Sequence, residues 1–231
     1  MLSEVLASHP EIAGIGEAHV RYVEPASLRD LALQIVYYRR ADVWRVRYLM
    51  DKVLHDSHLP AIADVAQWIP TRVIVLTRDP AAVVDSMRRW LNTDASDEAA
   101  MLDLDARLAN RYQKITEDVE SLPATVPVCL ARYEDLCTAP DASLACLSDF
   151  LGLKTPLTAA YQPSRLTGKW GFGDGSARIR AGRILTDGVT PRASRPASDI
   201  ARWAHERLQQ VVVSRGQPSG DRAAMARPVA A

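Results

Sequence analysis

Arg78 and Ser86 are the residues whose types and spacing point most directly to chemistry. Arg78 follows the apolar run 73–76, and Ser86 comes eight residues later on the helix expected next. Ligands of open parallel sheets bind beyond the carboxyl ends of the strands, which is where Arg78 is expected. Because a guanidinium presents paired N–H groups to two oxygens, Arg78 and the Ser86 hydroxyl together suit a phosphate monoester. The alternative is that Arg78 pairs with a carboxylate and Ser86 is an ordinary helix residue.

Tyr133 is a second candidate, at the end of a second expected strand over residues 126–131. It offers a ring face and a hydroxyl at the same sheet edge, and both can contact a purine. Spacing alone favours a half-buried core tyrosine instead.

A third candidate is the segment 173–183, which combines glycines with Ser176, Arg178, Arg180 and Arg183. A flexible cationic loop of this kind can fold over a polyanion, with its backbone N–H groups as further donors. The alternative is a basic loop that is only solvated.

Two apolar runs, 73–76 and 126–131, predict strands buried on both faces of a parallel sheet. Asp79 can cap the helix after the first run, and Pro80 suits its first position. The other expected helices cover residues 2–7, 27–40, 43–54, 59–68, 97–121, 144–151 and 198–213. This order predicts a three-layer α/β fold with a mainly parallel sheet, one domain over residues 1–214, and a disordered tail over 215–231.

Composition excludes several classes of protein. The chain has 231 residues, of which 48% are hydrophobic, and its 28 Lys and Arg balance 28 Asp and Glu. This balance gives no overall basic field for a nucleic acid or an anionic lipid, so any anion site must be local. No apolar run approaches the length of a membrane span, and no signal peptide is recognisable, so a cytoplasmic location is expected. The spacing of the cysteines and histidines predicts no metal site.

Together, these motifs resemble the superfamily of sulfotransferases that use 3′-phosphoadenosine-5′-phosphosulfate (PAPS), in its bacterial branch and with similarity to protein-tyrosine sulfotransferases. Residues 8–12 followed by Gly16-Glu17 resemble the segment after that family's first helix. Residues 73–87 resemble its 3′-phosphate motif, 132–136 its Tyr-Glu-Asp-Leu stretch and 173–184 its cofactor loop. The resemblance covers residues 1 to 210 and implies the P-loop NTPase-like sulfotransferase fold.

The resemblance implies a role for each candidate in binding the nucleotide. Arg78 and Ser86 would hold the 3′-phosphate, and Tyr133 would lie near the adenine. The segment from Ser176 to Arg183, with Arg178, would close over the nucleotide, and Arg192 is a weaker candidate.

The resemblance also implies two catalytic residues. Glu17 matches the general base of tyrosine sulfotransferases, which removes the proton of the acceptor hydroxyl. Lys52 resembles the family's lysine near the transferred sulfuryl group, where a cation stabilises charge on the bridging oxygen. The alternative for Glu17 is a surface glutamate after a glycine turn, and His19 is a weaker candidate on the acceptor side.

The sequence departs from the family at its start. The family begins with a strand and a Gly- and Ser/Thr-rich loop that binds the 5′-phosphosulfate ahead of a helix. This sequence begins inside that helix, so the strand and loop are missing, and we expect weak nucleotide binding and little transfer unless the true start lies upstream. Trp90 replaces a basic residue of tyrosine sulfotransferases, and Arg88 and Arg89 are candidates to take its place.

The sequence therefore predicts a transferase that moves a sulfuryl group from PAPS to a hydroxyl or amine of a small-molecule or peptide acceptor, without a metal. One alternative is a non-catalytic, truncated sulfotransferase remnant that binds a nucleotide or a protein. Another is a nucleotide kinase, which the lack of a Gly-x-x-x-x-Gly-Lys-Ser/Thr motif disfavours.

Overall fold

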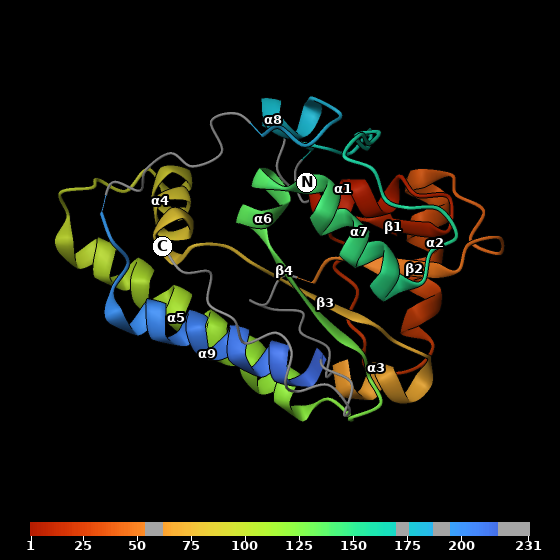
Figure 1. Cartoon of the computed structure of the whole chain (residues 1–231), viewed down its shortest axis with the longest axis horizontal. Helices are drawn as coiled ribbons and strands as arrows, with labels where there is room; N and C mark the ends of the chain where they lie inside the picture. The colour runs from red at the N-terminus through yellow and green to blue at the C-terminus, as the bar shows by residue number, and fades with distance from the viewer. Residues whose placement is uncertain (54–61, 170–175, 187–194, 217–231) are drawn as a thin grey trace.

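The strands form two small parallel sheets flanked by helices (Figure 1). The structure is a computed structural model, and it describes residues 1–53, 62–169, 176–186 and 195–216. Strand β1 (Ile12–Ile15) pairs with β2 (Tyr48–Asp51), and β3 (Val73–Thr77) pairs with β4 (Val128–Arg132). The mixed α/β character is as expected. The expected single sheet is not seen, because these four strands pair in two separate sheets.

The helices of the described ranges are α1 (Leu2–Ala7), α2 (Ser27–Arg39), α3 (Ile62–Trp68), α4 (Pro80–Leu91), α5 (Glu98–Ser121), α6 (Tyr133–Thr138), α7 (Pro140–Leu151), α8 (Ala177–Arg180) and α9 (Asp199–Gly216). None of them is long and apolar enough to cross a lipid bilayer. Figure 1 shows α5 and α9 side by side along one side of the molecule, whereas α1, α2 and α7 gather around β1 and β2.

Local chemistry explains where the best predicted helices begin and end. The Asp79 carboxylate accepts the Ala82 N–H at 2.9 Å and caps α4, with Pro80 in the first turn. Asp97 accepts the Ala100 N–H at 3.0 Å and caps α5 in the same way. Helix α7 ends at Gly152, whose φ of +60° is costly for residues with a side chain.

Two sequence expectations are wrong, and one helix was missed. The helix expected over 43–54 is replaced by β2, in which Tyr48 and Met50 face the core while Leu49 is exposed, a period of two. Pairing with β1 overrides the helical pattern there. Helix α6 was not expected, because its polar sequence has no apolar periodicity. Strand β3 is not buried on both faces, since the Leu76 side chain is 46% exposed.

One hydrophobic cluster joins the two sheets, and we call it the bridging cluster. All four strands contribute to it, through Ile12 of β1, Tyr48 and Met50 of β2, Ile74 of β3, and Cys129 and Ala131 of β4. Helices α1 and α7 supply half of its buried side chains. The other face of the β3–β4 sheet packs against α5 and α9, and β1 also packs against α2.

The amino-terminal ends of β2 and β3 are both anchored to the last turn of α7. Tyr48 donates its hydroxyl to the Leu151 carbonyl at 2.6 Å. Arg47, just before β2, donates to the Gly152 carbonyl, and Arg72, just before β3, donates to the Phe150 carbonyl. These bonds satisfy carbonyl groups that a helix end leaves without partners, and they place both strand starts at one point.

We predict that Leu144→Ala destabilises the whole molecule, because Leu144 is fully buried at the centre of the bridging cluster. The expected loss in the free energy of unfolding is about 2 to 5 kcal/mol. Urea unfolding followed by circular dichroism measures it. The control is Leu33→Ala on α2, where the side chain is 59% exposed and the change should stay within about 0.5 kcal/mol. Equal losses for the two variants would contradict the bridging role.

Candidate functional site

Arg78 and Tyr133 lie in contact at the carboxyl edge of the β3–β4 sheet. The parallel register pairs Thr77 with Arg132, so the residues that follow the two strands leave the sheet at the same level. The guanidinium carbon of Arg78 lies 4.6 Å from the centre of the Tyr133 ring. This is the distance of a cation–π contact, which holds a guanidinium by its face.

The Arg78 side chain has no hydrogen-bond or ion-pair partner within the described ranges. Its Nε is buried without a partner; the other two such side-chain atoms belong to Asp118 on α5 and to Arg195 just before α9. The alternative expectation, that Arg78 pairs with a carboxylate, is not seen among the described residues. Because stacking uses only the guanidinium face, the in-plane N–H groups remain able to bind a ligand oxygen.

The hydroxyl of Tyr133 is already engaged one turn further along α6. It interacts with the thiol of Cys137, a fully buried residue. Burial, followed by this contact, raises the pKa of Tyr133, and the charges of Arg78 and Arg178 oppose the rise. Tyr133 therefore has its ring, and not a free hydroxyl, to offer a base.

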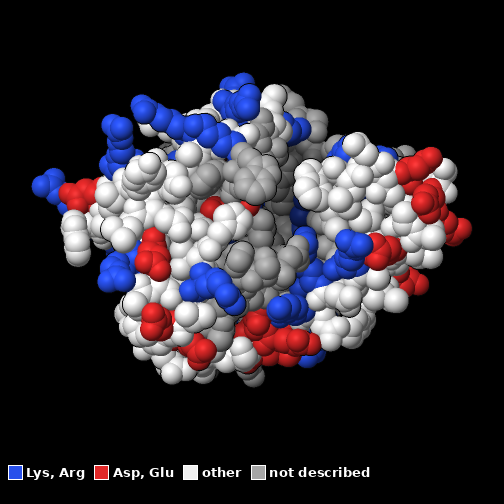
Figure 2. All heavy atoms as spheres, turned by 180° about the vertical axis from the view of Figure 1, so that it is seen from behind, with Lys and Arg blue, Asp and Glu red and all other residues white. Residues whose placement is uncertain are grey.

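Arg178 also belongs to this site, because its charge lowers the pKa of both Tyr133 and Cys137. Arg178 acts on both Tyr133 and Cys137, and its Nη2 donates to the Leu185 carbonyl at 3.2 Å. Tyr161 anchors the segment by donating its hydroxyl to the Ile179 carbonyl at 3.0 Å. Figure 2 shows basic side chains gathered at the top of the molecule, where Figure 1 places α8.

The remaining predicted nucleotide residues differ in how the structure places them. Ser176 occupies the N-cap position of α8. Arg183 is exposed, and its backbone bridges to Ala160. The half-buried Ser86, on α4, has no hydrogen-bond partner among the described residues. Arg192 and the glycines of 170–175 lie outside the described residues.

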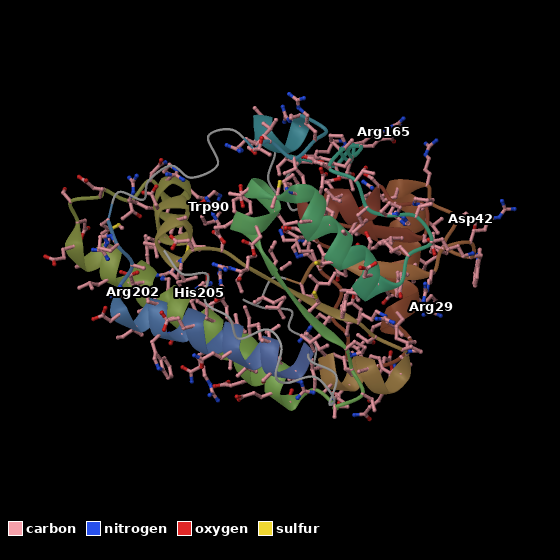
Figure 3. The ribbon with its side chains drawn as sticks, in the orientation of Figure 1. Arg29, Asp42, Trp90, Arg165, Arg202 and His205 are labelled. Atoms are coloured by element: carbon pink, nitrogen blue, oxygen red, sulfur yellow. The ribbon has the colours of Figure 1, made fainter. Side chains whose placement is uncertain are left out.

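Arg88 and Arg89 are not free to replace the basic residue expected at position 90. Arg88 Nε donates to Asp85 at 3.2 Å, and Arg89 forms an ion pair with the same carboxylate. Trp90 is exposed near the end of α4, as Figure 3 shows. The two arginines therefore stabilise α4, and the expectation that they compensate for Trp90 has no support here.

Glu17 and Lys52 meet at the carboxyl edge of the β1–β2 sheet. Ile15 pairs with Asp51, so Lys52 comes directly after one of two paired strand ends and Glu17 two residues after the other. Lys52 Nζ lies 2.7 Å from Glu17 Oε1, and the Glu17 side chain is only 12% exposed. The structure thus joins the two residues that the sequence assigned to catalysis, and it does not show the exposed glutamate of the alternative.

Two residues at this edge were missed by sequence reasoning. Asp51 accepts the Ala18 N–H at 2.9 Å through Oδ1 and the Tyr22 hydroxyl at 2.7 Å through Oδ2. Burial raises the pKa of Asp51, although these donors oppose the rise. A carboxylate directly before Lys52 was a visible signal, but no spacing rule connects Asp51 to Tyr22.

A cavity of about 230 Å³ opens behind the β3–β4 edge, between that edge and α9. Its lining includes Arg132, Arg202 and His205, together with the three carboxylates of Asp79, Glu134 and Glu206. Figure 3 shows Arg202 and His205 on α9. Burial lowers the pKa of His205, which favours its neutral form. Because the carboxylates repel anions, this cavity suits a phosphate less well than the Arg78 side of the edge. No group of three metal-binding side chains gathers anywhere in the described ranges.

We predict that alkylating reagents modify Cys146 first and Cys137 last in the folded protein. Cys146 is exposed on α7, whereas Cys137 is fully buried beneath Tyr133 and burial raises its thiol pKa. The thiolate is the reactive form, so both effects protect Cys137. Timed alkylation with iodoacetamide and mass spectrometry measures the order, and denaturant should equalise the rates. Early labelling of Cys137 would contradict the described packing.

Neither a protein-family model nor a curated protein matches this chain. What bears on function is therefore the chemistry of two strand edges. One carries a stacked guanidinium without a partner, and the other carries a paired carboxylate and ammonium.

Proposed function

We propose that this chain is a sulfotransferase of the PAPS-dependent type, which moves a sulfuryl group to a hydroxyl or amine of a small-molecule or peptide acceptor. The observation that carries the proposal is the Arg78–Tyr133 stack at the shared carboxyl edge of β3 and β4. It supplies a fixed cation whose N–H groups lack partners among the described residues. A bound phosphate would provide those partners.

The residues around this stack fit a nucleotide with a 3′-phosphate. Buried polar atoms nearly always have hydrogen-bond partners, so the Arg78 Nε without one indicates a site for an acceptor atom. Charge-assisted hydrogen bonds from Arg78 to phosphate oxygens would satisfy it. Ser86 would add a hydroxyl donor, and Arg178 a second cation near Tyr133.

The Glu17–Lys52 pair fits the catalytic half of the proposal. PAPS supplies a sulfuryl group on a phosphate leaving group. Lys52 contacts Glu17 Oε1, while Oε2 has no partner among the described residues and can accept the proton of an acceptor hydroxyl. As the acceptor oxygen bonds to sulfur and the sulfur–phosphate oxygen bond breaks, that proton goes to Glu17. Lys52 then balances the negative charge that develops on the leaving group.

The finer fold assignment is part of the same proposal. We infer that the two sheets are halves of one sulfotransferase-type sheet. Both are parallel, and both contribute to the bridging cluster. Within the described residues, β2 and β3 each pair with a strand on one side only, as strands beside an open central position would.

We predict that Arg78→Ala weakens binding of 3′-phosphoadenosine-5′-phosphate about 10- to 100-fold, because charge-assisted hydrogen bonds to the 3′-phosphate are lost. Isothermal titration calorimetry measures the affinity. Binding of AMP, which lacks the 3′-phosphate, should not change. The matched control is Arg72→Ala, since Arg72 also stacks on a ring, that of Phe150, but at the opposite end of β3. If Arg78→Ala binds both nucleotides as the wild type does, Arg78 is not in the site.

We predict that Glu17→Gln slows sulfuryl transfer about 100-fold or more, since a general base contributes at least this much. The affinity for 3′-phosphoadenosine-5′-phosphate should be unchanged, because Glu17 lies at the other strand edge. Transfer from labelled PAPS to a panel of hydroxyl and amine acceptors measures the rate. Unchanged transfer would remove Glu17 from the mechanism. Nucleotide binding by the wild type without any transfer would favour the non-catalytic alternative.

A further inference from the structure

We propose that Asp51 is a positioning residue, whose carboxylate clamps residues 18–22 over the end of β2 and thereby fixes Glu17 against Lys52. The clamp rests on the proposed function only for the roles of Glu17 and Lys52. Its geometry stands on contacts within the chain.

The two oxygens of Asp51 bind two points of one segment. Oδ1 accepts the Ala18 N–H at 2.9 Å, next to Glu17 in sequence, and Oδ2 accepts the Tyr22 hydroxyl at 2.7 Å. Asp51 is itself adjacent to Lys52 and pairs with Ile15. One side chain therefore ties the segment that follows Glu17 to the strand end that precedes Lys52.

The segment between these two contacts has a backbone that needs such support. His19 has a φ of +53°, a left-handed conformation that residues other than glycine adopt at a cost. Ala18 and Tyr22, on either side of it, are buried and pack in the cluster around α2. Strained backbone persists only where surrounding contacts determine it, and the Asp51 carboxylate supplies two of them.

The charge of Asp51 does not stabilise the fold, so a positioning role and a stabilising role predict different results for its replacement. Burial is the largest influence and raises the pKa of Asp51 above its ordinary value. A carboxyl whose pKa is raised on folding stabilises the fold when protonated, and this stabilisation is lost as the pH rises through the folded-state pKa. At neutral pH the charge on Asp51 is therefore a cost to stability. Asparagine keeps an acceptor for Ala18 without this charge.

The test measures how well Lys52 is held by Glu17. The chain has four lysines, and Lys114 and Lys154 are exposed internal references. Acetylation by an N-hydroxysuccinimide ester, resolved by mass spectrometry, reports each lysine separately. A lysine nitrogen held 2.7 Å from a carboxylate oxygen reacts more slowly, because the contact restricts the approach of the reagent. Glu17→Gln sets the rate expected when the pair is lost.

We expect Tyr22→Phe and Asp51→Asn to raise the acetylation rate of Lys52 about threefold or more toward the rate in Glu17→Gln, as loss of a modest ion pair would. The urea midpoint of Asp51→Asn should not fall. The matched control is Tyr48→Phe, which removes a phenol hydrogen bond from the same strand at its other end. It should leave Lys52 unchanged.

Wild-type acetylation of Lys52 in both Tyr22→Phe and Asp51→Asn would overturn the clamp. A large fall in the urea midpoint of Asp51→Asn with no change at Lys52 would assign Asp51 to stability instead. Neither readout needs nucleotide or turnover, so the clamp is decided even if no sulfuryl transfer is found. Where transfer is found, Tyr22→Phe should lower kcat without changing the affinity for 3′-phosphoadenosine-5′-phosphate.

Discussion

The packing of α1 and α7 onto all four strands is the constraint on which the rest of the structure depends. A sheet of two strands is at best marginally stable in water, and this chain has two such sheets in its described ranges. The bridging cluster gives both of them one shared core. The last turn of α7 also fixes where β2 and β3 begin, because Arg47, Tyr48 and Arg72 donate hydrogen bonds to its carbonyl groups. The residues with candidate chemistry lie at the other, carboxyl ends of the strands.

The two carboxyl edges differ in how their charges are satisfied. At the β1–β2 edge, Glu17 and Lys52 neutralise each other at 2.7 Å. At the β3–β4 edge, Arg78 rests on an aromatic ring and forms no ion pair in the described part of the chain. A ligand that completes both edges would therefore bring negative charge to Arg78 and a polar, proton-bearing group to Glu17. A phosphorylated nucleotide with a hydroxyl acceptor has this distribution.

The features that could be predicted from the sequence are those set by neighbouring residues. Asp79 and Pro80 begin α4, and Gly152 ends α7, because caps and turns are local chemistry. The sharing of one edge by Arg78 and Tyr133 was also expected, since parallel strands bring their carboxyl ends together. Strand β2 could not be predicted, because four residues carry too little pattern and their pairing partner is distant in sequence.

The contacts of the site that sequence reasoning missed could not be predicted for the same reason, because they join residues that are distant in sequence or lie in an unpredicted helix. Tyr22 and Asp51 are 29 residues apart, and only the register of β1 with β2 brings them together. The interaction between Tyr133 and Cys137 depends on α6, a helix whose polar sequence gives no apolar period. Sequence patterns identified the side chains that could bind a ligand or take part in a reaction. They could not show which of those side chains were already bound to one another.

A contrast between the two ends of the strands gives the functional proposal its physical basis. At the amino ends, Arg47, Tyr48 and Arg72 all donate to carbonyls of the chain, and these contacts hold the fold together. At the carboxyl ends, Arg78 Nε lacks a hydrogen-bond partner in the described ranges, Asp51 is partly buried at a cost, and His19 has a left-handed backbone. Costs of this kind are retained where a site needs them, because stability and site geometry make competing demands on the same residues. Their concentration at one end of the strands is what a ligand-binding edge requires.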